Sequence, residues 1–175
     1  MSLRWQLLRP FYDRLMAPLA PVRRHVIRAA VRDKDRVLLI GCGTGQTLQA
    51  LPPEATVVAI DQSAAMVTRT RRAAAERGMT IDGRVGDAAD TELPADAFDV
   101  ACLHLVLSIA DRPATLLDEA IRVLRPDGRL SILADRTVVN DLEALLDAAG
   151  AGVDHRMDTP HGCEGVIARP SGDPP

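Results

Sequence analysis

Short apolar runs recur along the chain and alternate with stretches of helical periodicity. The first run, residues 37–40, reads Val-Leu-Leu-Ile and ends at a glycine-rich turn. An unbroken apolar run bounded by turn residues predicts a strand that is buried on both faces of a parallel sheet. Similar patterns predict further strands, with their exits, at residues 55–60, 80–85, 98–107, 129–134, 152–159 and 162–169.

Helical periodicity fills the intervals between these runs. Residues 46–51, 63–77, 111–124 and 138–149 are predicted helices, and alternation of strand and helix predicts an α/β domain. Before the first strand, residues 3–16 carry apolar side chains four apart and predict an amphipathic helix, with a second helix at 22–31. We therefore expect a helical arm at 1–34, a domain at 35–170 and a tail at 171–175, in a single domain overall.

The composition is that of a globular domain with one hydrophobic core. A chain of 175 residues with 47% hydrophobic residues can bury one sizeable core. No apolar run approaches the roughly 20 residues that span a membrane. The three cysteines are scattered, which predicts reduced thiols in a cytoplasmic protein, and no cluster has metal-ligand spacing, so we expect no metal site.

Charge is distributed unevenly along the chain. Residues 1–36 hold nine basic and three acidic residues, a net charge of +6, whereas residues 37–175 carry a net charge of −9. A basic arm on an acidic body predicts an anionic partner for the arm, and peripheral contact of residues 1–30 with an anionic membrane is one such case. A solvated helix face explains the same charges equally well, so both interpretations stay open.

The glycine-rich turn carries the first candidate chemistry. Gly41, Gly43 and Gly45 alternate, which lets the backbone turn tightly and lets a ligand approach closely. A dinucleotide fingerprint needs a third glycine where this chain has Gln46, so a nicotinamide cofactor is disfavoured. Asp61 follows the second predicted strand, 20 residues after Gly41, where an acid in Rossmann-like folds accepts hydrogen bonds from ribose hydroxyls.

Five landmarks in this order resemble class I S-adenosylmethionine (SAM)-dependent methyltransferases. They are the glycine turn, Asp61, Gly86-Asp87, the strand at 98–103 and the sequence LRPDGRL at 124–130. The resemblance implies a Rossmann-like, doubly wound seven-stranded sheet in the order 3-2-1-4-5-7-6. In this fold strand 7 is antiparallel and helices cover both faces.

The resemblance also implies a cofactor and a set of site residues. The cofactor is SAM, with S-adenosylhomocysteine as its product. The implied cofactor-binding residues are Gly41, Cys42, Gly43, Thr44, Gly45, Asp61, Gln62, Met66, Gly86, Asp87, Ala88, Leu103 and His104. Two residues are candidate catalytic bases: His104 at the exit of the fourth strand, and Tyr12 if the first helix covers the pocket. For His104, shaping the pocket is an equally open role.

The opening segment at 11–30 resembles the ubiquinone/menaquinone-biosynthesis methyltransferases and the small phospholipid N-methyltransferases. This implies methyl transfer to a small-molecule or lipid-like acceptor, at a membrane surface for a lipid. Only a few residues separate Asp135 from the helix at Val138, so we expect an open acceptor pocket.

That short connection keeps a non-catalytic, regulatory SAM-binding subunit open as an alternative. A homodimer also stays open, and the acidic body disfavours a nucleic-acid partner.

Overall fold

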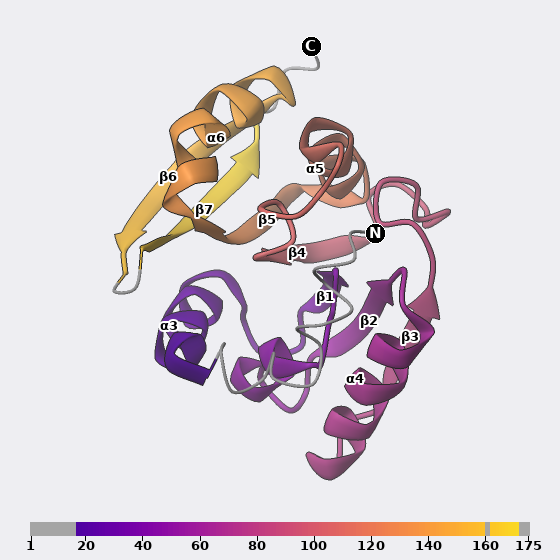
Figure 1. Ribbon diagram of the computed structural model, residues 1–175. Coiled ribbons are helices and arrows are strands. Elements are labelled where there is room, and N and C mark those ends of the chain that lie inside the picture. The colour runs from indigo at the N-terminus through magenta and orange to yellow at the C-terminus, as the bar shows by residue number, and fades with distance from the viewer. Residues whose placement is uncertain (1–16, 160–161, 172–175) are drawn as a thin grey trace.

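A seven-stranded sheet forms the centre of the molecule (Figure 1). The computed structural model describes residues 17–159 and 162–171. The strands are β1 (Arg36–Ile40), β2 (Thr56–Asp61), β3 (Ile81–Val85), β4 (Phe98–His104), β5 (Leu124–Asp135), β6 (Ala151–Asp158) and β7 (Cys163–Pro170). Their order is β3-β2-β1-β4-β5-β7-β6, and β7 runs antiparallel to both of its neighbours. The strand order and directions implied by the resemblance are therefore confirmed.

Helices cover both faces of this sheet, as predicted. They are η1 (Ala17–Leu19), α3 (Ala20–Ala30), η2 (Gln46–Ala50), α4 (Ala64–Glu76), α5 (Pro113–Arg122) and α6 (Arg136–Ala148). Helices α5 and α6 lie on one face, and α3 and α4 lie on the other (Figure 1). None of the helices in the described ranges is long and apolar enough to cross a membrane. The predicted helix at 3–16 lies outside the described residues.

The two-sided covering explains why β1 is apolar at every interior position. Leu38 and Ile40 pack into the hydrophobic core beneath α5 and α6, whereas Val37 and Leu39 pack into the core beneath α3 and α4. Successive side chains of a strand point to opposite faces, so a strand buried on both faces needs an apolar residue at each position. The apolar run at 37–40 was therefore a reliable signal.

Strand β5 begins earlier than the sequence predicted. The sequence predicted a strand at 129–134, but Leu124 already pairs with Phe98 of β4. The register then shifts, and pairing resumes between Val100 and Arg129. Leu124 is buried in the core beneath α5, which holds it in the sheet, so the residues between Leu124 and Arg129 form an irregularity within the strand.

A buried ion pair joins β5 to the approach of β1. One guanidinium nitrogen of Arg129 donates to Asp35 Oδ2 at 2.9 Å, and the other donates to the carbonyl of Ala30 at the end of α3, at 2.5 Å. Asp35 Oδ2 also accepts from the Arg32 N–H at 2.8 Å. Because both charged side chains are almost wholly buried, each depends on the other for compensation.

Candidate functional site

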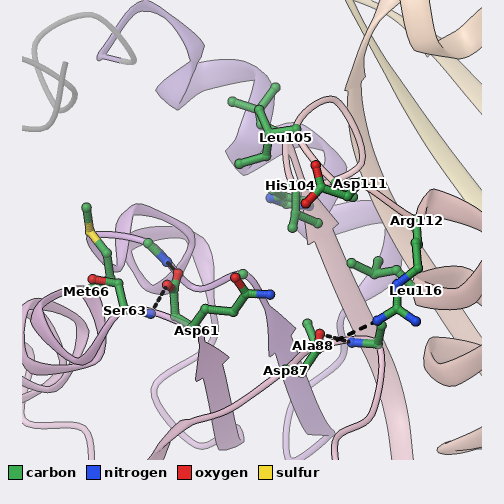
Figure 2. A pocket seen from close by; sticks show the side chains of 17 residues that line it. Asp61, Ser63, Met66, Asp87, Ala88, His104, Leu105, Asp111, Arg112 and Leu116 are labelled. Carbon is green, nitrogen blue, oxygen red and sulfur yellow. Dashed lines mark hydrogen bonds and ion pairs between the residues drawn. The ribbon is translucent and has the colours of Figure 1, made fainter. Parts of the chain in front are cut away.

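A cavity of about 550 Å³ opens at the carboxyl ends of the parallel strands. Its walls come from the turn after β1, residues 61–66 from the last residue of β2 onwards, residues 87–89 after β3, the segment 104–112 from the last residue of β4 onwards, and α5 (Figure 2). This edge of an open α/β sheet is where ligands bind in such folds, and the volume is within the range of small-molecule sites.

The three alternating glycines of the turn meet different surroundings. A Cβ on Gly41 would lie 2.6 Å from Val106, and a Cβ on Gly45 would lie 3.1 Å from the Thr70 Cα of α4, so protein atoms fill both positions. Gly43 differs, because its added Cβ would meet no atom closer than 3.9 Å. Gly43 lines the cavity, so its missing side chain leaves room for a ligand against the backbone.

Asp61 holds two of the cavity loops together. Its Oδ2 accepts from the Gly43 N–H and its Oδ1 accepts from the Ser63 N–H, both at 2.9 Å (Figure 2). Each carboxylate oxygen has two lone pairs, so each keeps one for a further donor. Since Asp61 is half-buried and lines the cavity, a ligand with hydroxyl groups can reach those lone pairs.

Asp87 lies across the cavity from Asp61, in the loop after β3 (Figure 2). Its Oδ1 accepts from the Ala89 N–H at 2.9 Å. Its Oδ2 lies 3.4 Å from a guanidinium nitrogen of Arg112, which precedes α5. Both side chains are largely exposed, so this contact at the cavity mouth is weak.

Buried hydrogen bonds anchor the loop that carries Asp87 to α5. Glu119 accepts from the backbone N–H of Thr91 at 2.9 Å, and also from the Thr91 hydroxyl. Arg122 donates to Glu119 at 2.6 Å and to the carbonyl of Leu93 at 2.7 Å. Burial raises the pKa of Glu119, but the hydrogen bonds from Arg122 and Thr91 outweigh it and hold the pKa at about 2. The carboxylate is therefore charged at neutral pH and fixes the loop.

His104 ends β4 at the cavity wall and is almost wholly buried. Its Nδ1 lies 3.4 Å from Thr47 Oγ1 of η2, and its Nε2 lies 3.1 Å from Ser131 Oγ of β5. Burial, and secondly the positive charge of Arg23 on α3, lower the pKa of His104 to about 3. The imidazole is therefore uncharged at neutral pH.

The segment after His104 adopts an unusual backbone conformation. Leu105 has a φ of +67°, a left-handed conformation that is rare for a bulky residue. Leu105 packs against the core beneath α3 and α4, whereas Val106 packs against the core beneath α5. Ile109 follows at the cavity wall with 53% of its surface exposed. The left-handed residue ends the strand and gives this side of the cavity an apolar wall.

The predicted cofactor-binding residues occupy three kinds of position. Those that line the large cavity are Gly41, Gly43, Asp61, Gln62, Met66, Asp87, Ala88 and His104. Cys42 and Thr44 line a small adjoining cavity of about 20 Å³, together with Arg23 and Gln46. Gly45, Gly86 and Leu103 line neither, and Leu103 packs into the core beneath α5 and α6. Tyr12 lies outside the described residues.

Sequence reasoning missed several residues at this site. Arg112 and Leu116 line the large cavity, and Thr47 and Arg23 line the small one. The only signal for Arg112 and Leu116 was that they follow the exit of β4. Within residues 17–159 and 162–171, no three His, Cys, Asp or Glu side chains gather as metal ligands. The cysteines are buried free thiols.

Comparison with known proteins adds a family match. A family described as "Methyltransferase domain" matches residues 38–132, more than half of the chain. The chain is 41% identical over 102 residues to nocamycin O-methyltransferase of Saccharothrix syringae, a stretch that covers 55% of this chain and 36% of that protein. It is 33% identical over 135 residues to ubiquinone biosynthesis O-methyltransferase of Xylella fastidiosa, covering 74% of this chain and 54% of that protein. The chain thus spans about a third to a half of the length of these curated relatives.

Solved structures share the fold at lower identity. The crystal structure of the [4+2]-cyclase SpnF superposes with a TM-score of 0.75 and 21% identity, covering 86% of this chain and 81% of that one. At this level of identity the likeness concerns the fold alone.

Proposed function

The chain belongs to the methyltransferase domain family, and on this premise we propose that it transfers a methyl group from SAM to a small-molecule acceptor. When bound, SAM supplies an electrophilic methyl group on a sulfonium. The observation that carries the proposal is the pairing of the open face of Gly43 with the Asp61 carboxylate on one cavity wall. An adenosyl group offers the ribose hydroxyls that the remaining Asp61 lone pairs accept.

We propose a role for each side of the cavity. Asp61 accepts from the ribose, with Gln62 and Met66 beside it, and Asp87 and Ala88 hold the adenine. The residues Gly41 to Gly45 receive the amino-acid portion of the cofactor. The apolar wall after β4 excludes water and orients the acceptor, which is the main contribution an enzyme makes to an in-line displacement. That Tyr12 or His104 acts as a general base stays a prediction. The contacts of His104 support a positioning role instead.

A pair of glycine variants tests the cofactor site. Gly43 and Gly78 share a left-handed φ, +57° and +68°, so Gly43→Ala and Gly78→Ala carry comparable backbone strain. Only the Gly43 methyl group enters the cavity, because Gly78 follows α4 and its Cβ would point into open space. By calorimetric titration, Gly43→Ala should weaken S-adenosylhomocysteine binding about tenfold or more, while Gly78→Ala binds like the parent. A parent protein that binds NAD and not S-adenosylhomocysteine refutes the proposal.

A second candidate function is SAM binding without methyl transfer. The absence of methyl transfer has support in the name of the [4+2]-cyclase neighbour, because that name indicates that this fold serves other chemistry. A regulatory SAM-binding subunit belongs to the same alternative. A screen of acceptors that detects release of S-adenosylhomocysteine separates the two candidates. A protein that binds SAM but releases no S-adenosylhomocysteine with any acceptor favours the second.

We further propose that the acceptor is lipid-like and is met at an anionic membrane surface. The relative named for ubiquinone biosynthesis supports a lipid-like acceptor, and the exposed side chains of Arg24, Arg28 and Arg32 support an anionic surface. Each basic residue near such a surface contributes about 1 kcal/mol, and salt screens it. The protein should co-sediment with anionic vesicles at low salt and be released as salt rises. Absence from the vesicle pellet at low salt contradicts this proposal and leaves the cofactor site untouched.

A further inference from the structure

A buried polar trio links the glycine turn to the middle of the sheet. His104 contacts the Thr47 hydroxyl through Nδ1 and the Ser131 hydroxyl through Nε2, at 3.4 and 3.1 Å. Thr47 belongs to η2, directly after the glycine turn, and Ser131 belongs to β5. All three residues are less than 9% exposed. The imidazole therefore bridges three elements that meet at the cavity.

The contacts of the ring occupy both of its nitrogens. A neutral imidazole has one N–H donor and one lone pair, and a hydroxyl can donate or accept. Whichever nitrogen carries the proton, the two hydroxyls can satisfy both nitrogens at once. To take a proton from an acceptor, the ring would have to present its lone pair to that acceptor, which displaces the hydroxyl that donates to the same nitrogen.

The surrounding charges also oppose protonation. Burial and the positive charge of Arg23 lower the pKa of His104 to about 3. Arg23 is itself 4% exposed and donates to the Gln46 side chain at 2.7 Å, so this charge is fixed beside η2. Asp61, on the next loop of the cavity wall, is engaged by two backbone N–H groups. A group in such surroundings is a poor general base near neutral pH.

We propose that His104 is a positioning residue that stays uncharged, tying the glycine turn through Thr47 to β5 through Ser131, and that it takes no proton from the acceptor. The kinetic test of this proposal rests on the proposed function.

Two variants separate positioning from proton transfer. His104→Asn keeps one donor and one acceptor in the trio on a smaller side chain, whereas His104→Leu leaves both buried hydroxyls without a polar partner in the ring's place. Positioning predicts that His104→Leu weakens S-adenosylhomocysteine binding about tenfold and that His104→Asn restores it to within about threefold. It also predicts that kcat of His104→Asn stays within about tenfold of the parent, with an unchanged pH profile. General-base catalysis predicts the reverse: both variants lose kcat by about a hundredfold or more and bind S-adenosylhomocysteine normally.

A titration that needs no turnover decides the same question independently. The imidazole signal of His104, assigned by its loss in His104→Asn, should show no titration by NMR from about pH 5 to about pH 8. A titration in that range, or a hundredfold loss of kcat in His104→Asn with parental binding, overturns the inference. If the parent protein binds no S-adenosylhomocysteine, the proposed function fails, while the NMR titration still tests the state of His104.

Discussion

Replacing Asp61 by asparagine removes one charge from the centre of the site while nearly keeping the shape of the side chain. The carboxylate now accepts from the Gly43 and Ser63 N–H groups at 2.9 Å each. In Asp61→Asn one of the two oxygens becomes an NH₂ group, which cannot accept, so one loop loses its acceptor. The remaining oxygen is neutral and binds its donor less strongly.

The expected loss follows from these contacts. A hydrogen bond to a charged group contributes about 1.5–3 kcal/mol and a neutral one about 0.5–1.5 kcal/mol. The variant loses one acceptor oxygen, and the oxygen that remains is a weaker acceptor for both its loop N–H group and the ribose. We therefore expect S-adenosylhomocysteine affinity to fall by about 2 kcal/mol, or about thirtyfold. Asp61→Ala removes both acceptors, and its loss should be about 3 kcal/mol, more than a hundredfold.

Calorimetric titration with S-adenosylhomocysteine measures the loss, and thermal unfolding checks that each variant is folded. Asp82→Asn is the matched control, because this exposed carboxylate on neighbouring β3 pairs with Arg84 and does not line the cavity. The control should bind like the parent. If folded Asp61→Asn binds S-adenosylhomocysteine with parental affinity, Asp61 does not contact the cofactor and the reasoning is wrong.

Three further predictions concern the surroundings of the site. Because Arg122 helps to hold the pKa of Glu119 at about 2, against an ordinary 4.5, Glu119 stabilises the fold by about 3 kcal/mol above about pH 4.5 and loses this as pH falls towards 2. In urea unfolding, Glu119→Gln should lose most of that stability at neutral pH and little near pH 2; an equal loss at both contradicts the pKa. Ile109→Ser should raise the acceptor KM up to about tenfold with unchanged S-adenosylhomocysteine affinity, whereas Val85→Ser, which is similarly exposed but does not line the cavity, changes neither. Arg129→Met should cost about 3–5 kcal/mol of unfolding free energy by leaving its buried carboxylate partner uncompensated, and a parental value would contradict that burial.

The sheet and one side of the site could be predicted because each depends on a local pattern. Apolar runs mark strands that are buried on both faces, and residues that follow such strands meet at one edge of the sheet. The pattern placed Gly43 and Asp61 at the edge of the sheet where both line one cavity, and the resemblance added Asp87. The strand order came from the resemblance, since no period in the sequence specifies which strands are neighbours.

Contacts between distant segments could not be predicted in this way. Thr47 and Ser131 meet His104 across 57 and 27 residues, and their hydroxyls carry no sequence signature. Neighbouring strand residues point to opposite faces, so Leu103 enters the core while His104 reaches the cavity, and choosing between them needs the sheet's orientation. The left-handed Leu105 likewise follows from packing on both cores, not from an intrinsic preference of leucine.

The position of β7 between β5 and β6 affects how the protein folds while it is being synthesised. Strand β6 joins the sheet only through β7, and β7 also covers the edge of β5. A ribosome synthesises residues 163–170 after β1 to β6. Until then the nascent protein exposes an unpaired edge of β5, and β6 has no neighbouring strand. Open edges invite pairing with other chains, so the interval before β7 is delivered is when this protein is most exposed to misassembly.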